Sequence, residues 1–366
     1  MRLNFYFASI CIVALLTVLS GQSKAQVDNF LVPAANRTDL VHDLATDILY
    51  IANGSEISRF DIGSQNFLAP ITLPGTRLLG IDLSPDGNTL AVTDRNEANS
   101  TQNRIHVIDT NSLSTREVLF QQQSLESGTF SASFTSNDQV IVSSSFAGSG
   151  NVPLRLVTLG PDTSQVIDSV RQDTILTSSA DLSVVAFAES NSSGGPFGRY
   201  RIADGDIDSA GTGSFNYEIG VNRDGTQFAV PGFSGTEFYD EDLNLLFELS
   251  PGSIEGIIGV VYSPVADLAY LAWHSFAGPR PSIEIYDTNT FELVGAIDST
   301  DQFDWIGNNA FIEGRLEISR DGQSLFATVD GGVRVYATGV AAVPEPAATT
   351  VCLGLLLAAA SRRRRS

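Results

Sequence analysis

An aspartate-containing turn between two apolar strands recurs along this chain, and it restricts the fold more than any other feature. The turn acids are Asp47, Asp86, Asp138, Asp181, Asp224, Asp267 and Asp321. Successive gaps between them are 39, 52, 43, 43, 43 and 54 residues. Because a four-stranded propeller blade takes roughly 40–50 residues, seven anchors predict an all-β chain folded as a seven-bladed β-propeller of antiparallel blades. The copies around Asp138 and Asp181 are degenerate, which leaves six or eight blades as alternatives.

The clearest copy runs from residue 79 to residue 109. A first strand over 79–84 leads into Pro85-Asp86-Gly87, a second strand covers 89–93, and a third covers 104–109. Gly after Asp accepts the positive φ of a tight hairpin turn. Alternating apolar and polar residues indicate half-buried strands, and few stretches have helical periodicity.

The last copy ends one strand short, while the first copy is preceded by a spare extended segment, Val27–Ala34. We expect this segment to supply the outer strand of the last blade. Such closure removes an open sheet edge, which would otherwise favour aggregation.

The repeats resemble the YVTN-type propeller family, which is close to the lactonase-like and WD40-like propellers. The resemblance lies in Ser84-Pro85-Asp86-Gly87, in the strand 105–109, and in the strand 283–287. No Trp-Asp dipeptide occurs, so a WD40 assignment is poor. A lactonase-like relationship would imply a channel metal held by Glu, Asp and Asn, but the sequence assigns no such residues.

Residues 1–25 match a secretory signal peptide. Arg2 precedes an apolar core over 8–19, and Ser23-Lys24-Ala25 offers small residues at the two positions that a signal peptidase reads. Cleavage after Ala25 is expected, and an uncleaved anchor is the alternative.

The C-terminal segment 343–366 resembles the PEP-CTERM sorting signal. Pro344, Glu345 and Pro346 precede an apolar stretch over 347–360, and Arg362, Arg363, Arg364 and Arg365 follow it. The stretch of ~14 apolar residues would halt in a membrane with slight mismatch, with the arginines on the cytoplasmic side. The resemblance implies processing by an exosortase and a destination at the outer surface or in an exopolysaccharide matrix; a plain membrane anchor is the alternative.

The propeller is expected over 26–340, and its charge narrows its partners. Outside Arg2, Lys24 and the four terminal arginines the chain has 15 cationic residues, all arginine, against 42 acids. Such a surface repels nucleic acid and anionic lipid, since binding either requires Lys or Arg at phosphate. It favours solubility, and it attracts divalent cations or basic partners. The two cysteines lie in the terminal segments, so the propeller has no disulfide.

Few residues suggest catalysis. There is no Gly-x-Ser-x-Gly elbow and no phosphate-binding loop. Asp204, Asp206 and Asp208 alternate, so their oxygens can face one Ca²⁺. The twelfth position counted from Asp204 is Phe215 where an EF-hand needs Glu. A solvated hairpin turn is therefore the favoured alternative.

Trp273 and Trp305 lie beside long loops and are candidates for stacking on a carbohydrate, although core packing is the commoner role of Trp. The three histidines, His42, His106 and His274, are isolated in sequence. They are interpreted as structural residues, with His42 and His274 able to face the channel or a blade surface.

These observations favour an exported envelope or matrix protein whose propeller is a non-catalytic module for binding or scaffolding. Its expected partners are the signal peptidase and exosortase that process it, and an exopolysaccharide or surface protein that it binds. The alternatives are a metal-dependent hydrolase or lactonase with its site in the channel, and a structural coat protein stabilised by Ca²⁺.

Overall fold

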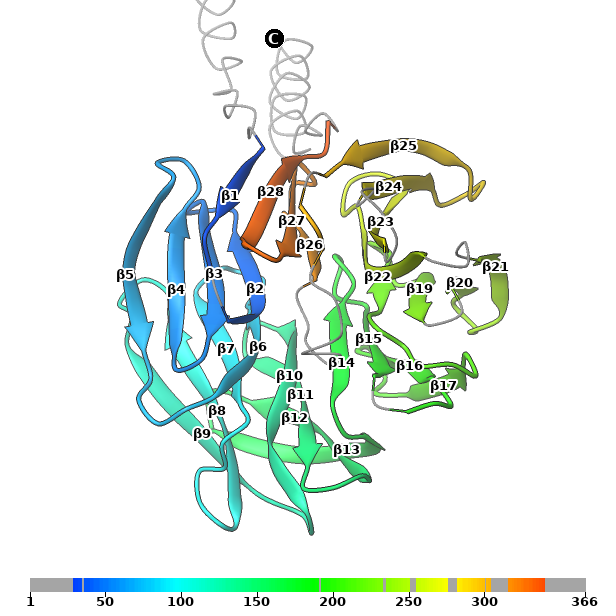
Figure 1. Ribbon diagram of the computed structural model, residues 1–366. Coiled ribbons are helices and arrows are strands. Elements are labelled where there is room, and N and C mark those ends of the chain that lie inside the picture. Colours follow the sequence, from blue (N-terminus) through cyan, green and yellow to red (C-terminus); the bar gives the residue numbers. More distant parts are fainter. Residues whose placement is uncertain are drawn as a thin grey trace, which may run out of the picture.

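The computed structural model describes residues 29–34, 36–190, 192–232, 235–250, 255–275, 282–299, 301–303 and 315–339. They form 28 strands in seven four-stranded antiparallel sheets, which confirms the predicted seven-bladed propeller. Figure 1 shows the blades arranged around a common centre in chain order. Within the described residues, no helix is long and apolar enough to cross a membrane.

The first four blades follow one another along the chain, each numbered from its innermost strand outward. Blade 1 consists of β2 (Arg37–Asp43), β3 (Ile48–Asn53), β4 (Glu56–Asp61) and β5 (Asn66–Thr72). Blade 2 consists of β6 (Leu78–Leu83), β7 (Thr89–Asp94), β8 (Gln102–Asp109) and β9 (Thr115–Gln121). Blade 3 consists of β10 (Glu126–Ser136), β11 (Gln139–Phe146), β12 (Asn151–Thr158) and β13 (Thr163–Arg171). Blade 4 consists of β14 (Thr174–Ser178), β15 (Val184–Glu189), β16 (Pro196–Arg201) and β17 (Ile207–Gly211).

The remaining three blades complete the ring. Blade 5 consists of β18 (Gly220–Val221), β19 (Gln227–Gly232), β20 (Gly235–Asp240) and β21 (Leu245–Leu249). Blade 6 consists of β22 (Glu255–Tyr262), β23 (Leu268–Ser275), β24 (Ser282–Asp287) and β25 (Leu293–Asp298). Blade 7 consists of β26 (Leu316–Ile318), β27 (Ser324–Val329), β28 (Gly332–Ala337) and β1 (Phe30–Val32).

Blade 7 is closed by the N-terminal strand, as the sequence predicts. β1 pairs antiparallel with β28, with Leu31 opposite Arg334, and the two strands lie side by side in Figure 1. Val32 is fully buried, and it packs in an apolar cluster between blade 7 and blade 1. The ring is therefore held shut by strands from both ends of the propeller.

All seven predicted turn acids lie in the hairpin between the first and second strands of a blade. In several of these turns a serine two residues earlier donates its hydroxyl to the aspartate, as Ser84 does to Asp86 at 2.7 Å. Gly87 and Gly322 follow the acid with φ of 75° and 71°, a backbone conformation that glycine adopts without strain. The repeat in the sequence is thus a repeat of turn chemistry.

The apolar core is divided among the interfaces between neighbouring blades. Six of the seven apolar clusters of described residues each join two adjacent blades, including the seam between blades 7 and 1. The seventh joins blades 4 and 5 and also includes Leu79 of blade 2 and Phe130 of blade 3. The alternation of each strand explains this, because its two faces meet different neighbours. The packing of neighbouring blades against each other therefore stabilises the ring. Since this core lies between the blades, it does not fill the centre of the ring.

Candidate functional site

The innermost strands of all seven blades enclose a central cavity of about 520 Å³. Its wall includes residues of β2, β6, β10, β14, β18, β22 and β26. The cavity reaches the end of the channel where the hairpin turns lie, because Pro85, Ser179 and Pro264 of these turns also line it. A volume of this size is typical of small-molecule sites, which span roughly 300–1,000 Å³.

Four acidic side chains line this cavity, from four different blades. Asp39 comes from blade 1, Asp82 from blade 2, Glu218 from the segment entering blade 5, and Glu317 from blade 7. No two of them are near each other in sequence, so the closed ring alone brings them together.

Asp39 and Asp82 are used to join neighbouring blades. The backbone N–H of Ile81 in blade 2 donates to Oδ2 of Asp39 at 2.7 Å. In the same way the N–H of Phe134 in blade 3 donates to Oδ2 of Asp82 at 2.7 Å. Each carboxylate also accepts the N–H of the residue that follows it. Each acid therefore accepts two backbone hydrogen bonds, one of them from the next blade, and so helps to hold the ring together.

Glu218 and Glu317 differ from that pair. Glu218 is 6% exposed, and the N–H of Ile219 approaches its Oε1 at 3.4 Å. Its Oε2 is buried and accepts no hydrogen bond from any described residue. Glu317 lies two residues before its hairpin, the position that Asp82 holds in blade 2, but no described residue donates a hydrogen bond to it. Both residues line the cavity, and each has a carboxylate oxygen with no donor among the described residues.

Burial raises the pKa of all four carboxyl groups. Removal from bulk water is the largest cause in each case, and it raises the pKa of Asp82 to about 6 and that of Glu218 to about 7. The pKa of Asp39 and that of Glu317 lie well above their usual values, with mutual repulsion among the acids as a further cause. Asp82 and Glu317 line the cavity and keep part of their surface exposed.

Three arginines lie at or beside the cavity, and they compensate the acids only in part. Arg320 reaches from blade 7 to blade 2 and donates to the carbonyl groups of Leu83 (2.8 Å) and Pro85 (2.7 Å). Arg223 is paired with Asp267 at 2.8 Å. Arg315 lowers the pKa of Glu218, but burial outweighs it. The cavity wall thus has more acidic groups than arginines.

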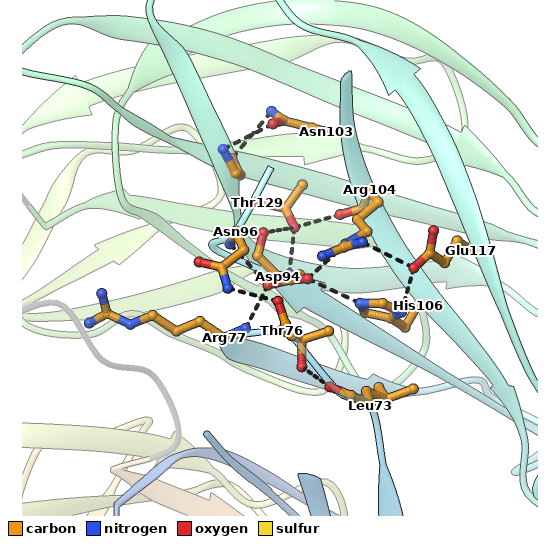
Figure 2. Close-up of polar contacts among 12 residues, drawn as sticks. Leu73, Thr76, Arg77, Asp94, Asn96, Asn103, Arg104, His106, Glu117 and Thr129 are labelled. Atoms are coloured by element: carbon orange, nitrogen blue, oxygen red, sulfur yellow. Dashed lines mark hydrogen bonds and ion pairs between the residues drawn. The ribbon is translucent and has the colours of Figure 1, made fainter. Parts of the chain in front are cut away.

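A second polar cluster lies within blade 2, around Asp94 (Figure 2). Asp94 is fully buried and accepts hydrogen bonds from Arg104 Nε at 2.8 Å and from the N–H of Arg77 at 2.8 Å. His106 Nε2 lies 3.2 Å from the same carboxylate. Hydrogen bonds from these donors outweigh burial, so the pKa of Asp94 is lowered. Both carboxylate oxygens of Asp94 accept hydrogen bonds from neighbouring residues, which indicates a structural role for the cluster.

The predicted acidic cluster lies in the β16–β17 hairpin and is bound by arginine. The guanidinium of Arg201 lies 3.3 Å from Asp204, 2.6 Å from Asp206 and 3.1 Å from Asp208. Arg199 also pairs with Asp208 at 3.2 Å. In the part of the chain that the structure describes, no three His, Cys, Asp or Glu side chains are grouped so as to hold a metal ion. The Ca²⁺ site at this cluster stays a prediction.

The other predicted residues fall in different places. Trp273 is 8% exposed and packs in the apolar cluster between blades 5 and 6, the core role weighed against stacking on a sugar. Trp305, the Pro-Glu-Pro motif and the terminal arginines lie outside the described residues, as does the signal peptide. Of the histidines, His42 lines the cavity, whereas His274 contacts the carbonyl of Phe303.

The channel acids were missed by reasoning from the sequence, although a signal was present. Asp82 and Glu317 each precede a turn acid by four residues, in strands that are otherwise apolar. An acid at that position in an innermost strand faces the ring centre.

No protein-family model and no curated protein sequence matches the chain. The case for a site therefore depends on the geometry of the propeller.

Proposed function

We propose that this chain is an exported envelope or extracellular-matrix protein whose propeller is a non-catalytic binding module, with its ligand in the central channel. The observation that carries the proposal is the cavity of about 520 Å³, which is lined by Glu218, a residue whose buried Oε2 has no hydrogen-bond partner among the described residues. An acceptor left without a partner in a folded interior costs stability. A ligand that donates a hydrogen bond to Glu218 would remove this cost.

The wall residues of the cavity support binding in preference to hydrolysis. The hydroxyl groups of Ser133 and Ser178 hydrogen-bond to each other at 2.9 Å, and Ser179 donates to Asp181 at 2.8 Å. His42 is engaged with Asp47 through Nε2 at 3.1 Å. These contacts commit the serine hydroxyl groups and Nε2 of His42 to the framework, whereas nucleophilic catalysis needs a nucleophile paired with its base.

Export and processing form the second part of the proposal, and the two terminal segments support it. Intact mass spectrometry of the protein from its producing cells should give a mature chain that begins after Ala25 and lacks the segment after the Pro-Glu-Pro motif. Recovery of a full-length C-terminus in the membrane fraction would favour the plain anchor.

Binding in the channel is tested by obstructing it. Thr177 of β14 lines the cavity and is partly buried, so Thr177→Trp fills the channel from the wall. Thr163 of β13 is exposed on the outermost strand of blade 3, and Thr163→Trp is the matched control. Calorimetry against soluble fractions of the surrounding matrix should give a saturable ligand for the wild type and for Thr163→Trp only.

The same fractions and a set of lactones and esters serve as substrates in a turnover assay. Reversible binding without product supports the proposal. Turnover that Thr177→Trp abolishes and Thr163→Trp keeps would overturn it in favour of a hydrolase. Equal binding by both variants would place the ligand outside the channel.

A further inference from the structure

The charge on the cavity wall indicates the class of ligand that the channel accepts. Four carboxylic acids line the cavity, and the arginines that line it with them are Arg223 and Arg320. Both guanidinium groups are already bound, Arg223 by Asp267 and Arg320 by backbone carbonyl groups of blade 2. The acids therefore outnumber the arginines. Because both guanidinium groups already have partners, they donate few hydrogen bonds to the acids of the cavity.

The unused acceptors are concentrated on two of the four acids. Asp39 and Asp82 take backbone N–H donors from the next blade. Glu218 has a buried Oε2 that no described residue satisfies, and Glu317 accepts no hydrogen bond from the described chain. One blade separates Glu218 from Glu317, and repulsion from Glu218 is one of the causes that raise the pKa of Glu317.

A single metal ion fits this wall poorly. Ca²⁺ takes six to eight oxygen ligands that converge on one point. The described acids are spread around the ring, and no three of them are grouped at metal-binding spacing. The wall also includes apolar residues, among them Ile175, Val260 and Leu316, which offer contacts that a bare ion cannot use.

We infer that the channel binds a compact organic cation, with protonated amino groups donating hydrogen bonds to Glu218 and Glu317 and with its carbon skeleton against the apolar wall. This inference rests on the proposed function, since it names the ligand class for the same channel. An ammonium group supplies three N–H donors and one positive charge, which matches the free acceptors and the excess of acids. Charge-assisted hydrogen bonds of this kind are about twice as strong as neutral ones.

The probe is 1,4-diaminobutane, titrated into the full chain by calorimetry at pH 8. Butane-1,4-diol has the same carbon skeleton without the charge, and CaCl₂ supplies charge without the skeleton. We expect saturable binding of the diamine, with the diol at least tenfold weaker. Glu218→Gln and Glu317→Gln should each weaken the diamine by about ten- to a hundredfold, since each removes a charged acceptor.

Asp206→Asn is the matched control, because it removes a carboxylate from the arginine-bound hairpin outside the channel. It should leave the affinity for the diamine unchanged. Circular dichroism melts of all variants establish that they are folded, and Glu218→Gln is an isosteric change at a site that carries an unsatisfied acceptor.

The experiment distinguishes failure of the inferred ligand class from failure of the proposed function. Diamine binding that Thr177→Trp or the channel glutamines do not weaken, or binding of CaCl₂ alone, would overturn the inference. If the diol and diamine fail while a neutral matrix fraction binds and Thr177→Trp blocks it, the channel is a binding site and only its ligand class is wrong. If no fraction binds in the channel, the proposed function fails as well.

Discussion

Replacing Glu218 with glutamine tests whether the channel holds negative charge that the protein does not compensate. The folded state raises the pKa of this carboxyl from 4.5 to about 7, with burial as the largest cause and Arg315 acting in the opposite direction. An acid with a raised pKa contributes its full stability below the pKa of the unfolded chain. That contribution is lost as pH rises toward the folded pKa.

The size of the effect follows from the shift. A rise from 4.5 to about 7 corresponds to about 3 kcal/mol at 1.36 kcal/mol per pKa unit. Glutamine keeps the shape of the side chain and does not titrate. At pH 4.5 the variant and the wild type should therefore have similar free energies of unfolding. At pH 8 the variant should be more stable, by up to about 3 kcal/mol.

The assay is urea unfolding followed by circular dichroism at pH 4.5, 6 and 8, in buffer free of amines. The control is Asp206→Asn, an exposed acid outside the channel, for which the difference from the wild type should not grow with pH. A Glu218→Gln variant that is less stable than the wild type at pH 8 would refute the reasoning. It would mean that the ionised carboxylate is needed as a partner for Arg315.

Three further changes test the framework. Asp94→Asn removes the acceptor of Arg104 and His106, and urea unfolding measures the resulting loss of stability. Because the pKa of Asp94 is lowered, its contribution to the free energy of unfolding is present at neutral pH and lost in acid, so this loss should shrink below about pH 4. Glu126→Gln leaves the fully buried Arg155 without its ion pair and should cost about 3–5 kcal/mol in the same assay, while an unchanged midpoint would contradict the burial of that pair. Val32→Asp places a charge in the seam between blades 7 and 1 and should release β1, which hydrogen exchange of the β28 amides would report; retained protection would contradict closure by this strand.

The blade count could be predicted from the sequence because its signal is local. Each hairpin needs its own turn chemistry, so Asp86 and Asp321 mark their turns whatever the rest of the chain does. Closure by β1 could be predicted for a related reason, since a blade one strand short leaves an edge that must be paired.

The channel site could not be predicted in the same way because it is assembled from distant residues. Asp39 and Glu317 are 278 positions apart, and each is a single acid in an apolar strand. Local spacing indicated the cluster of Asp204, Asp206 and Asp208 instead. The same hairpin that gathers those acids also carries Arg201 opposite them, and the guanidinium takes the position between the carboxylates.

The stability and the binding of the channel should change in opposite directions, and one variant measures both. Glu218 costs stability at pH 8 because its charge is buried without a full set of partners. The same unused charge is what the inferred cation would neutralise. Glu218→Gln should therefore gain stability in amine-free buffer and lose affinity for 1,4-diaminobutane, and the diamine should raise the melting temperature of the wild type more than that of the variant. A gain in stability with affinity unchanged would separate the two and remove Glu218 from the ligand site. A loss of both would make it a structural residue of the ring, as Asp39 and Asp82 are.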